Sequence, residues 1–174
     1  VQDQGWNQSG VPAVFLVMEL IEEHTLREYL NERGRFEIKD AINYLTPILS
    51  ALAAAHALGI VHRDIKPENI VIKSYSRCEV KLIDFGSSCF VTDHLTTYIQ
   101  SRSYRAPEVI LGMPYDFRID IWSLGGVLAE MLTGYVLFQN DSIATMLARI
   151  AGILGPFPEA LMQNQAECSK YFVG

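Results

Sequence analysis

The chain reads His62-Arg63-Asp64-Ile65-Lys66-Pro67-Glu68-Asn69 near its middle, and Asp84-Phe85-Gly86 follows after a short apolar segment. Neither sequence is specific alone, because an Asp-Phe-Gly triplet is common by chance and a lone Asp64 is an ordinary loop carboxylate. Together they are more informative, since the first follows a long helical pattern and the second follows a pattern typical of a β-hairpin.

Helical periodicity dominates the chain on both sides of these loops. We expect helices over residues 25–32, 38–58, 117–133 and 142–154, and strands over residues 13–18, 70–72 and 80–83. The longest helix is expected to place Ile38, Ala41, Ile42, Leu45, Leu49, Leu52 and Ala55 on one apolar face. Pro47 is expected to kink this helix or remove one backbone hydrogen bond. The prediction is therefore an α+β fold that is mainly helical, with short β-hairpins beside the site.

The ends of these elements are marked by capping residues and by loops. Gly34, Gly59, Gly134 and Gly155 are expected to stop the four helices in chain order. Asp116 is the predicted cap of the third helix, and Asn140 or Asp141 that of the fourth. Residues 1–11 are polar and predict a loop, and residues 84–107 lack sustained periodicity and predict a long functional loop.

The composition is that of an ordinary globular protein. The 174 residues are 49% hydrophobic, which suits about one domain, and the net charge of −6 argues against a nucleic-acid-binding protein. Cys78, Cys89 and Cys168 have no metal-like spacing, so we expect free thiols in a reducing compartment. The most apolar stretch, residues 48–61, is too short to span a bilayer, and no signal segment is visible. We therefore expect a soluble cytoplasmic or nuclear protein without membrane partners.

The sequences at 62–69 and 84–86 resemble the catalytic and metal-binding loops of eukaryotic-type protein kinases. The resemblance implies that the γ-phosphoryl group of ATP passes to a protein hydroxyl, with Mg²⁺ as the metal. The Lys-Pro-Glu at residues 66–68 is similar to that of Ser/Thr kinases, because dedicated tyrosine kinases usually carry Ala and Arg there. We therefore expect Ser and Thr hydroxyls of protein substrates as acceptors, with dual specificity left open.

Four polar residues suit the chemistry of phosphoryl transfer, which needs positioning and charge neutralisation. Asp64 is expected to accept the proton of the substrate hydroxyl as the base, and Lys66 to offset charge on the transferring group and bind ATP. Asn69 and Asp84 offer the hard oxygen ligands that Mg²⁺ prefers. Gly86 is expected to relieve backbone strain beside Asp84.

The resemblance also implies structural roles around these loops. His62 and Phe85 are expected to pack together and hold the two loops in register. Asp120 lies in a match to the central helix of the family and is expected to hydrogen-bond the backbone of the catalytic loop. Glu108 belongs to an Ala-Pro-Glu match, whose Glu normally pairs with a later Arg. Because Arg149 is the only Arg after Arg118, we expect Glu108 to lack that partner.

Residues 17–21 resemble a kinase strand that runs into the hinge between the two lobes. By that resemblance Met18 is the gatekeeper, the carbonyl of Glu19 and the N–H of Ile21 bind adenine, and Val71 packs beneath the adenine ring. The alternative, which the stretch alone would favour, is merely a buried strand.

The stretch from Tyr98 to Arg105 resembles the dual-specificity tyrosine-regulated kinases. The resemblance implies phosphorylation of Tyr98, with Arg102 and Arg105 as candidates to receive the phosphate. Arg63 is expected to brace the activation segment. The alternative is an unmodified, exposed Tyr98.

The resemblance divides the chain into residues 1–12, as a loop or the end of an N-terminal lobe, and residues 13–174, as a partial kinase domain. The chain has no Gly-x-Gly, and all five lysines follow the hinge match. We therefore expect a C-terminal lobe truncated at both ends and inactive alone. Two other hypotheses stay open: a non-catalytic scaffold derived from a kinase, and a small-molecule phosphotransferase, which Ala-Pro-Glu disfavours.

Overall fold

A computed structural model of the chain describes residues 2–6, 12–16, 19–20, 23–93, 98–139 and 142–172. Its strands are β1 (Gln2–Trp6), β2 (Pro12–Leu16), β3 (Ile60–Val61), β4 (Ile70–Ser74), β5 (Glu79–Leu82) and β6 (Cys89–Phe90). Its α-helices are α1 (Leu26–Arg33), α2 (Ile38–Ala57), α3 (Pro107–Ile110), α4 (Arg118–Thr133), α5 (Ile143–Leu154) and α6 (Gln165–Cys168). Four 3₁₀ turns complete it: η1 (Pro67–Asn69), η2 (Phe85–Ser87), η3 (Arg102–Tyr104) and η4 (Glu159–Met162). The predicted mainly helical α+β fold is confirmed.

The predicted helix ends agree with the structure at most positions. Thr25 caps α1 through a capping box with Glu28, and Gly34 follows its last residue with φ +77°. Gly134 ends α4 in the left-handed conformation, where its N–H donates to the carbonyl of Glu130. The predicted cap of α4 is wrong, because the helix begins at Arg118 with Phe117 as its N-cap, and Asp116 instead accepts a hydrogen bond of 2.9 Å from the backbone N–H of Arg118.

Helix α5 begins after Ser142, whose side chain forms a capping box with Thr145. The predicted caps Asn140 and Asp141 lie outside the described residues. The helix ends before Gly155, as predicted.

The buried face of the long helix α2 agrees only in part with the one predicted, because Ala41 and Leu52 are buried as expected and three other predicted positions are not. Its buried side chains are those of Ala41, Tyr44, Ile48 and Leu52, whereas Ile38, Ile42 and Leu49 are exposed. The reason is that apolar residues surround much of this helix, and its contacts with α4 and β5 select one side. Pro47 lies inside α2, which continues through it without a break. Gly59 comes just after the end of the helix and has φ +74°.

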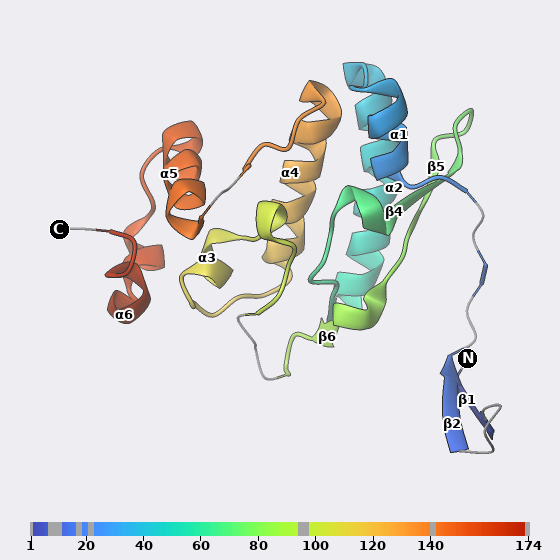
Figure 1. Cartoon of the computed structure of the whole chain (residues 1–174), viewed down its shortest axis with the longest axis horizontal. Helices are drawn as coiled ribbons and strands as arrows, with labels where there is room; N and C mark the ends of the chain where they lie inside the picture. The colour runs from blue at the N-terminus through green and yellow to red at the C-terminus, as the bar shows by residue number, and fades with distance from the viewer. Residues whose placement is uncertain are drawn as a thin grey trace.

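The described strands form three two-stranded antiparallel sheets. The predicted hairpin is confirmed as β4–β5, with Ile70 opposite Leu82. Strand β3, just before the catalytic-loop sequence, pairs with β6, just after Asp-Phe-Gly. Strand β1 pairs with β2, although residues 1–11 predicted a loop, because β2 supplies a pairing partner that local composition does not reveal. Figure 1 shows the β1–β2 hairpin apart from the helical body.

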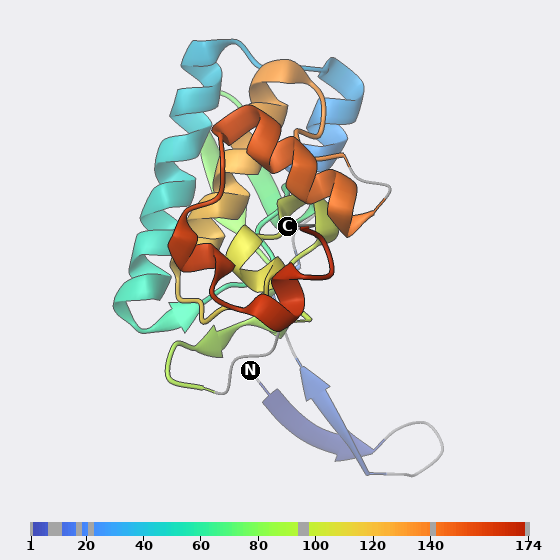
Figure 2. The ribbon, with the colours of Figure 1, turned by 90° about the vertical axis from the view of Figure 1, so that its left-hand side faces the viewer.

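Two main apolar clusters build the body. The larger cluster joins α1, α2, α4 and the β4–β5 hairpin, and it includes Leu52, Ile70 and Met131. The second joins α3, α5 and α6 and includes Leu147 and Cys168. Figure 2 shows α5, η4 and α6 in front of α3 and α4. The central helix α4 therefore lies between the two halves, with the loops of interest on one side of it.

Two further expectations concern the cysteines and the membrane. Cys78, Cys89 and Cys168 are free, as predicted. None of the helices in the described ranges combines the length and apolar character that a membrane span requires.

Candidate active site

Asp120 anchors the loop that carries the predicted base. Its side chain is fully buried in α4, and its carboxylate accepts hydrogen bonds from the backbone N–H of His62 at 2.9 Å and of Arg63 at 2.8 Å. The ring Nε2 of His56 lies 2.9 Å from the same carboxylate. The predicted role of Asp120 is confirmed, and His56 is a partner that sequence reasoning missed. Three polar contacts satisfy a carboxylate that would otherwise be costly to bury.

Asp64 lies at the centre of a cluster of side chains. Its Oδ2 accepts a hydrogen bond of 2.6 Å from Nζ of Lys66, and its Oδ1 accepts one of 2.9 Å from Oγ of Ser101. The backbone N–H of Ser101 donates a further bond of 3.1 Å to Oδ1. Burial raises the pKa of Asp64, but the contacts with Lys66 and Ser101 outweigh it and hold the pKa below the usual value. The contacts with Lys66 and Ser101 therefore favour the charged form of Asp64 and fix the orientation of its carboxylate.

Lys66 and Ser101 form a bridge between two loops. Nζ of Lys66 donates to Asp64 and, at 3.1 Å, to Oγ of Ser101. Ser101 was missed at the sequence level, because it is 37 residues from Asp64 and belongs to no quoted catalytic motif. A Ser beside Ser/Thr-rich sequence carries no signal that would have identified it.

Asn69 faces the same carboxylate from η1. Its amide Nδ2 donates to the carbonyl of Asp64 at 2.8 Å and to Oδ2 at 3.1 Å. These two bonds use the amide nitrogen, and no described residue donates to the amide oxygen. That oxygen is a hard ligand of the kind that Mg²⁺ takes, so the residue fits the predicted metal site.

Asp84 lies next to Asn69 through the backbone. The N–H of Ile83 donates to the carbonyl of Asn69 at 3.0 Å, which sets the following residue beside the end of η1. Asp84 is exposed and has φ 62°, so the strained backbone is at Asp84 itself. Gly86 donates its N–H to Oδ1 of Asp84 at 3.2 Å, and a Cβ there would lie 3.1 Å from the same atom. Gly86 therefore permits a close approach to the carboxylate, but it was expected to relieve backbone strain, and the left-handed conformation lies at Asp84 and not at Gly86.

His62 and Phe85 pack against each other as predicted. Their ring centroids are 4.6 Å apart, and Nε2 of the buried His62 lies 3.1 Å from the carbonyl of Ile83. The two loops are therefore held together by this pair, by Ile83 and by the contacts of Asn69.

The predicted adenine-binding segment is described only in part. Met18 and Ile21 lie outside the described residues. Glu19 is exposed, and its carboxylate pairs with Lys81 and, at 3.7 Å, with Lys73 of the β4–β5 hairpin. These two lysines lower the pKa of Glu19 and were not identified from the sequence.

Val71 of β4 is 3% exposed and bridges to Thr25 at the start of α1. It lies in the strand that leads from Asn69, on the hairpin whose lysines hold Glu19. The strand therefore links the predicted adenine-binding residue to the loop of the predicted metal ligand.

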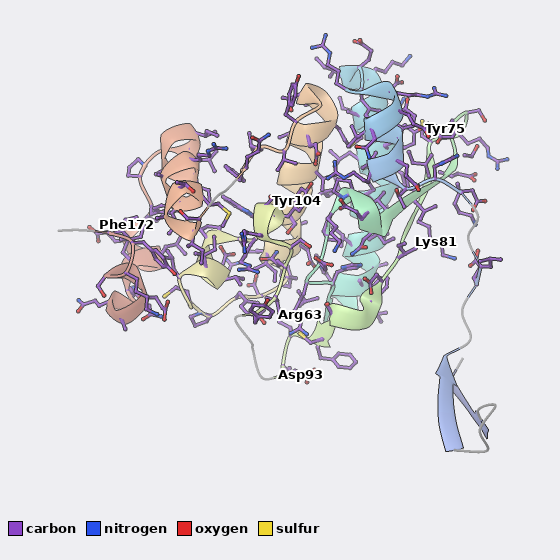
Figure 3. All side chains as sticks on the ribbon, viewed as in Figure 1. Arg63, Tyr75, Lys81, Asp93, Tyr104 and Phe172 are labelled. Carbon is purple, nitrogen blue, oxygen red and sulfur yellow. The ribbon has the colours of Figure 1, made fainter. Side chains whose placement is uncertain are left out.

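The four residues with predicted regulatory roles lie around one side of Asp64. Tyr98, Arg102 and Arg105 line an open hollow of about 380 Å³ together with Asp64. Tyr98 is 91% exposed. Arg63 donates from Nε to the carbonyl of Ser87 just after Asp-Phe-Gly, which identifies the partner that the sequence left open. Figure 3 labels Arg63 near β6.

Arg105 is engaged with the backbone of its own loop. Its Nε donates to the carbonyl of Ile99 at 2.8 Å, and its Nη2 donates to the carbonyl of Gln100 at 2.9 Å. Burial and the nearby charge of Arg102 lower its pKa. Arg105 therefore holds the turn beside Tyr98, while Arg102 is exposed.

Gln100 attaches this loop to the central helix. Its Nε2 donates to Oγ of Ser123 at 2.8 Å and to the carbonyl of Ile119 at 3.0 Å, and its Oε1 accepts from the N–H of Ala106 at 2.9 Å. Its φ of 62° is uncommon for a residue with a side chain. The buried amide thus compensates for the strained backbone with three hydrogen bonds.

Glu108 in α3 is largely buried, and no described residue forms an ion pair with it. Burial raises its pKa, and the more distant charge of Arg118 only partly opposes this effect.

Comparisons with known proteins identify the same likeness as the motifs. Residues 7–170 match the family model described as protein kinase domain. Dual specificity tyrosine-phosphorylation-regulated kinase 3 of Rattus norvegicus is 47% identical over 143 residues, which are 82% of this chain and 24% of that protein. Serine/threonine-protein kinase ppk5 of Schizosaccharomyces pombe is 47% identical over 124 residues, which are 71% of this chain and 15% of that protein. A crystal structure of a kinase domain superposes with a TM-score of 0.81 at 32% identity, covering 86% of this chain and 52% of the other. The chain thus spans about a quarter or less of the length of these two relatives.

Proposed function

Because the chain belongs to the protein kinase family, we propose that it serves the transfer of the γ-phosphoryl group of ATP to Ser and Thr hydroxyls of protein substrates. The observation that carries this proposal is the cluster around Asp64, where Lys66, Asn69 and Ser101 all contact one carboxylate. Names of two similar proteins include "dual specificity" and "serine/threonine", which supports hydroxyl acceptors in proteins.

Asp64 is the base of the proposed reaction. Its lowered pKa keeps the carboxylate ionised at neutral pH, so that it can orient and accept the proton of the substrate hydroxyl. Lys66, whose Nζ lies 2.6 Å from Asp64, would offset negative charge on the transferring phosphoryl group. Proton transfer and charge stabilisation thus come from two residues of one loop.

Asn69 and Asp84 would hold Mg²⁺ through side-chain oxygens. The bonds that Asn69 donates to Asp64 orient its amide, which leaves its oxygen available as a ligand. A bound Mg²⁺ supplies neutralisation of phosphate charge. The carbonyl of Glu19 and the N–H of Ile21 would bind the adenine of ATP, with Val71 beneath the ring.

Tyr98 is the proposed site of regulatory phosphorylation. Its exposure makes it accessible, and the shared hollow with Arg102 and Arg105 offers positive charge to a phosphate. Phosphorylation of Tyr98 would order its loop, and Arg63 would couple that loop to the Asp-Phe-Gly loop through its bond to the carbonyl of Ser87. The free cysteines support a reducing compartment, so we place the protein in the cytoplasm or nucleus.

The test is phosphoryl transfer from Mg²⁺–ATP to a general protein substrate by the natural full-length protein. We expect transfer to Ser and Thr that Asp64→Asn lowers by about 10²- to 10⁴-fold, because the base is removed. Asp40→Asn on the exposed surface of α2 is the matched control and should keep full activity. The 174 residues alone, with no Gly-x-Gly sequence, should be inactive. Near-wild-type turnover by Asp64→Asn would overturn the assignment of the base, and no transfer by the natural protein would overturn the function.

A further inference from the structure

Arg27 of α1 connects three groups from distant parts of the chain. Its Nη1 donates to Oε1 of Glu130 at 2.5 Å, and its Nη2 donates to the hydroxyl of Tyr104 at 2.9 Å. Its Nε donates to Oε1 of Glu68 at 2.7 Å. Figure 3 labels Tyr104 beside α4, where this network lies. The network plays no part in the proton transfer or metal binding proposed above.

The two carboxylates that Arg27 contacts differ in their surroundings. The side chain of Glu130 is 3% exposed, whereas that of Glu68 is 45% exposed. The buried Glu130 needs both the guanidinium and the hydroxyl of Tyr104, which donates to it at 2.5 Å. This end of Arg27 is therefore anchored, and Nε remains held against the half-exposed carboxylate of Glu68.

Glu68 borders a hollow that adjoins the base. The hollow has a volume of about 460 Å³, and its lining includes Lys66, Ser101 and Tyr104. Glu68 is the only carboxylate among the described residues that line it. Because Lys66 and Ser101 both contact Asp64, a peptide with its hydroxyl at the base would place a neighbouring side chain at this hollow.

We propose that Arg27 is a specificity-determining residue whose guanidinium occupies Glu68 and weakens selection of a basic side chain next to the acceptor hydroxyl. This inference rests on the proposed function, because it assumes that a peptide binds beside Asp64. A substrate cation that approaches Glu68 meets a carboxylate already paired with Arg27 at 2.7 Å, and Lys66 and Arg102 line the same hollow. The pair with Arg27 and the repulsion from these two cations oppose the attraction of a substrate cation to Glu68, so the hollow discriminates little between basic and neutral side chains.

The first test removes the charge of Arg27 and measures peptide binding in the natural full-length protein. Fluorescence anisotropy compares the binding of peptides that carry Arg or Ala at each position flanking the acceptor. In all of these peptides the acceptor Ser is replaced by Ala, so that binding is measured without phosphoryl transfer. Arg27→Gln should raise the affinity ratio of Arg to Ala peptide by about three- to tenfold at one position. Arg27→Lys, which keeps the charge, should retain the wild-type ratio, and adding Glu68→Gln to Arg27→Gln should remove the gain.

The second test keeps the buried pair intact, since Arg27→Gln risks leaving Glu130 uncompensated. Glu68→Gln leaves Arg27 paired with the buried Glu130 and removes the carboxylate from the lining of the hollow, where Lys66 and Arg102 are then the remaining charged residues. A peptide with Glu at the same position should then bind about threefold better than its Ala counterpart. If Glu68→Gln leaves that ratio unchanged, or if a folded Arg27→Gln leaves the Arg-to-Ala ratio unchanged, the inference is overturned.

The binding readout also separates this inference from the proposed function. Shifted affinity ratios together with an absence of transfer to the corresponding Ser peptides would support the role of Arg27 and refute phosphoryl transfer. Normal phosphoryl transfer together with unshifted affinity ratios would support the proposed function and refute the role of Arg27.

Discussion

The hydroxyl of Ser101 donates a hydrogen bond of 2.9 Å to Oδ1 of Asp64, although 37 residues separate them. The same hydroxyl accepts from Nζ of Lys66, so that one side chain contacts both proposed catalytic residues. Asp64 thereby receives donors from two loops, and the second loop is the one that contains Tyr98. The position of the base therefore depends on the fold of the loop that we propose to be regulated.

Replacing Ser101 should change both the rate and its pH dependence. Ser101→Ala removes one of the hydrogen bonds that hold the pKa of Asp64 below its usual value, so this pKa should rise toward that value. Because the base must be ionised, the loss of kcat/KM on the acid side should begin at a higher pH than in the unchanged protein. We also expect kcat/KM at neutral pH to fall about tenfold, as for loss of a bond to a charged group. The pH profile of the natural full-length protein measures both effects.

Ser101→Thr is the matched control, because it keeps the hydroxyl. It should preserve the wild-type acid limb. An unshifted acid limb in Ser101→Ala would show that the hydroxyl does not tune the base.

Asp120 should be essential for stability. Asp120→Ala leaves the buried N–H groups of His62 and Arg63 without their acceptor and should lower the free energy of unfolding by about 3 kcal/mol. Urea unfolding of the 174-residue chain, followed by circular dichroism, measures this change. Asp40→Ala, at an exposed position of α2, is the control and should change little. Equal stability of the two variants would contradict the anchoring role.

Tyr98 should matter through its modification. Tyr98→Phe keeps the ring and removes the hydroxyl that would carry phosphate, so activity of the natural full-length protein should decrease severalfold. Peptide mapping by mass spectrometry should find phosphate on Tyr98 in the active protein. Tyr135→Phe, at a position where the tyrosine is 72% exposed, serves as the control. Full activity with an unmodified Tyr98 would exclude this regulation.

Glu108 should make stability depend on pH. Its pKa in the folded chain is raised by burial above the unfolded value, which is about 4.3 for a glutamate. The folded state therefore binds more protons between the two values, and stability falls as the pH rises through that window. Glu108→Gln removes this penalty, so it should stabilise the chain at pH 7 and have much less effect near pH 4.

The measurement is urea unfolding of the 174-residue chain at both pH values, with Glu159→Gln, at an exposed position, as the control. A gain for Glu108→Gln that is the same at both values would rule out ionisation as its cause.

Several parts of this fold could be predicted because their causes are local. The helix stops at Gly34, Gly59 and Gly134 follow from backbone conformations that glycine adopts easily, and these residues have φ values of +77°, +74° and +80°. The β4–β5 hairpin follows from two β-rich segments separated by polar turn residues.

Other parts depended on contacts between distant segments. Apolar residues surround much of α2, so the periodicity did not reveal that Ile48 is buried whereas Ile38 and Ile42 are exposed. Residues 2–6, which the sequence predicted as a loop, form strand β1 because they pair with β2. Gln100 has two partners on α4, Ile119 and Ser123, about twenty residues away, and no local pattern could indicate them.

The sequence by itself determined which residues we propose for the chemistry, because motif order and spacing single out Asp64, Lys66, Asn69 and Asp84 and the loops that hold them. Only the tertiary structure decided what surrounds them. Ser101, His56 and Arg27 reach the site from other segments, and their hydrogen bonds set the charge, orientation and access of the base and its neighbours. The physical reason is that hydrogen bonds and charge pairs act over a few ångströms in space, whatever the separation along the chain.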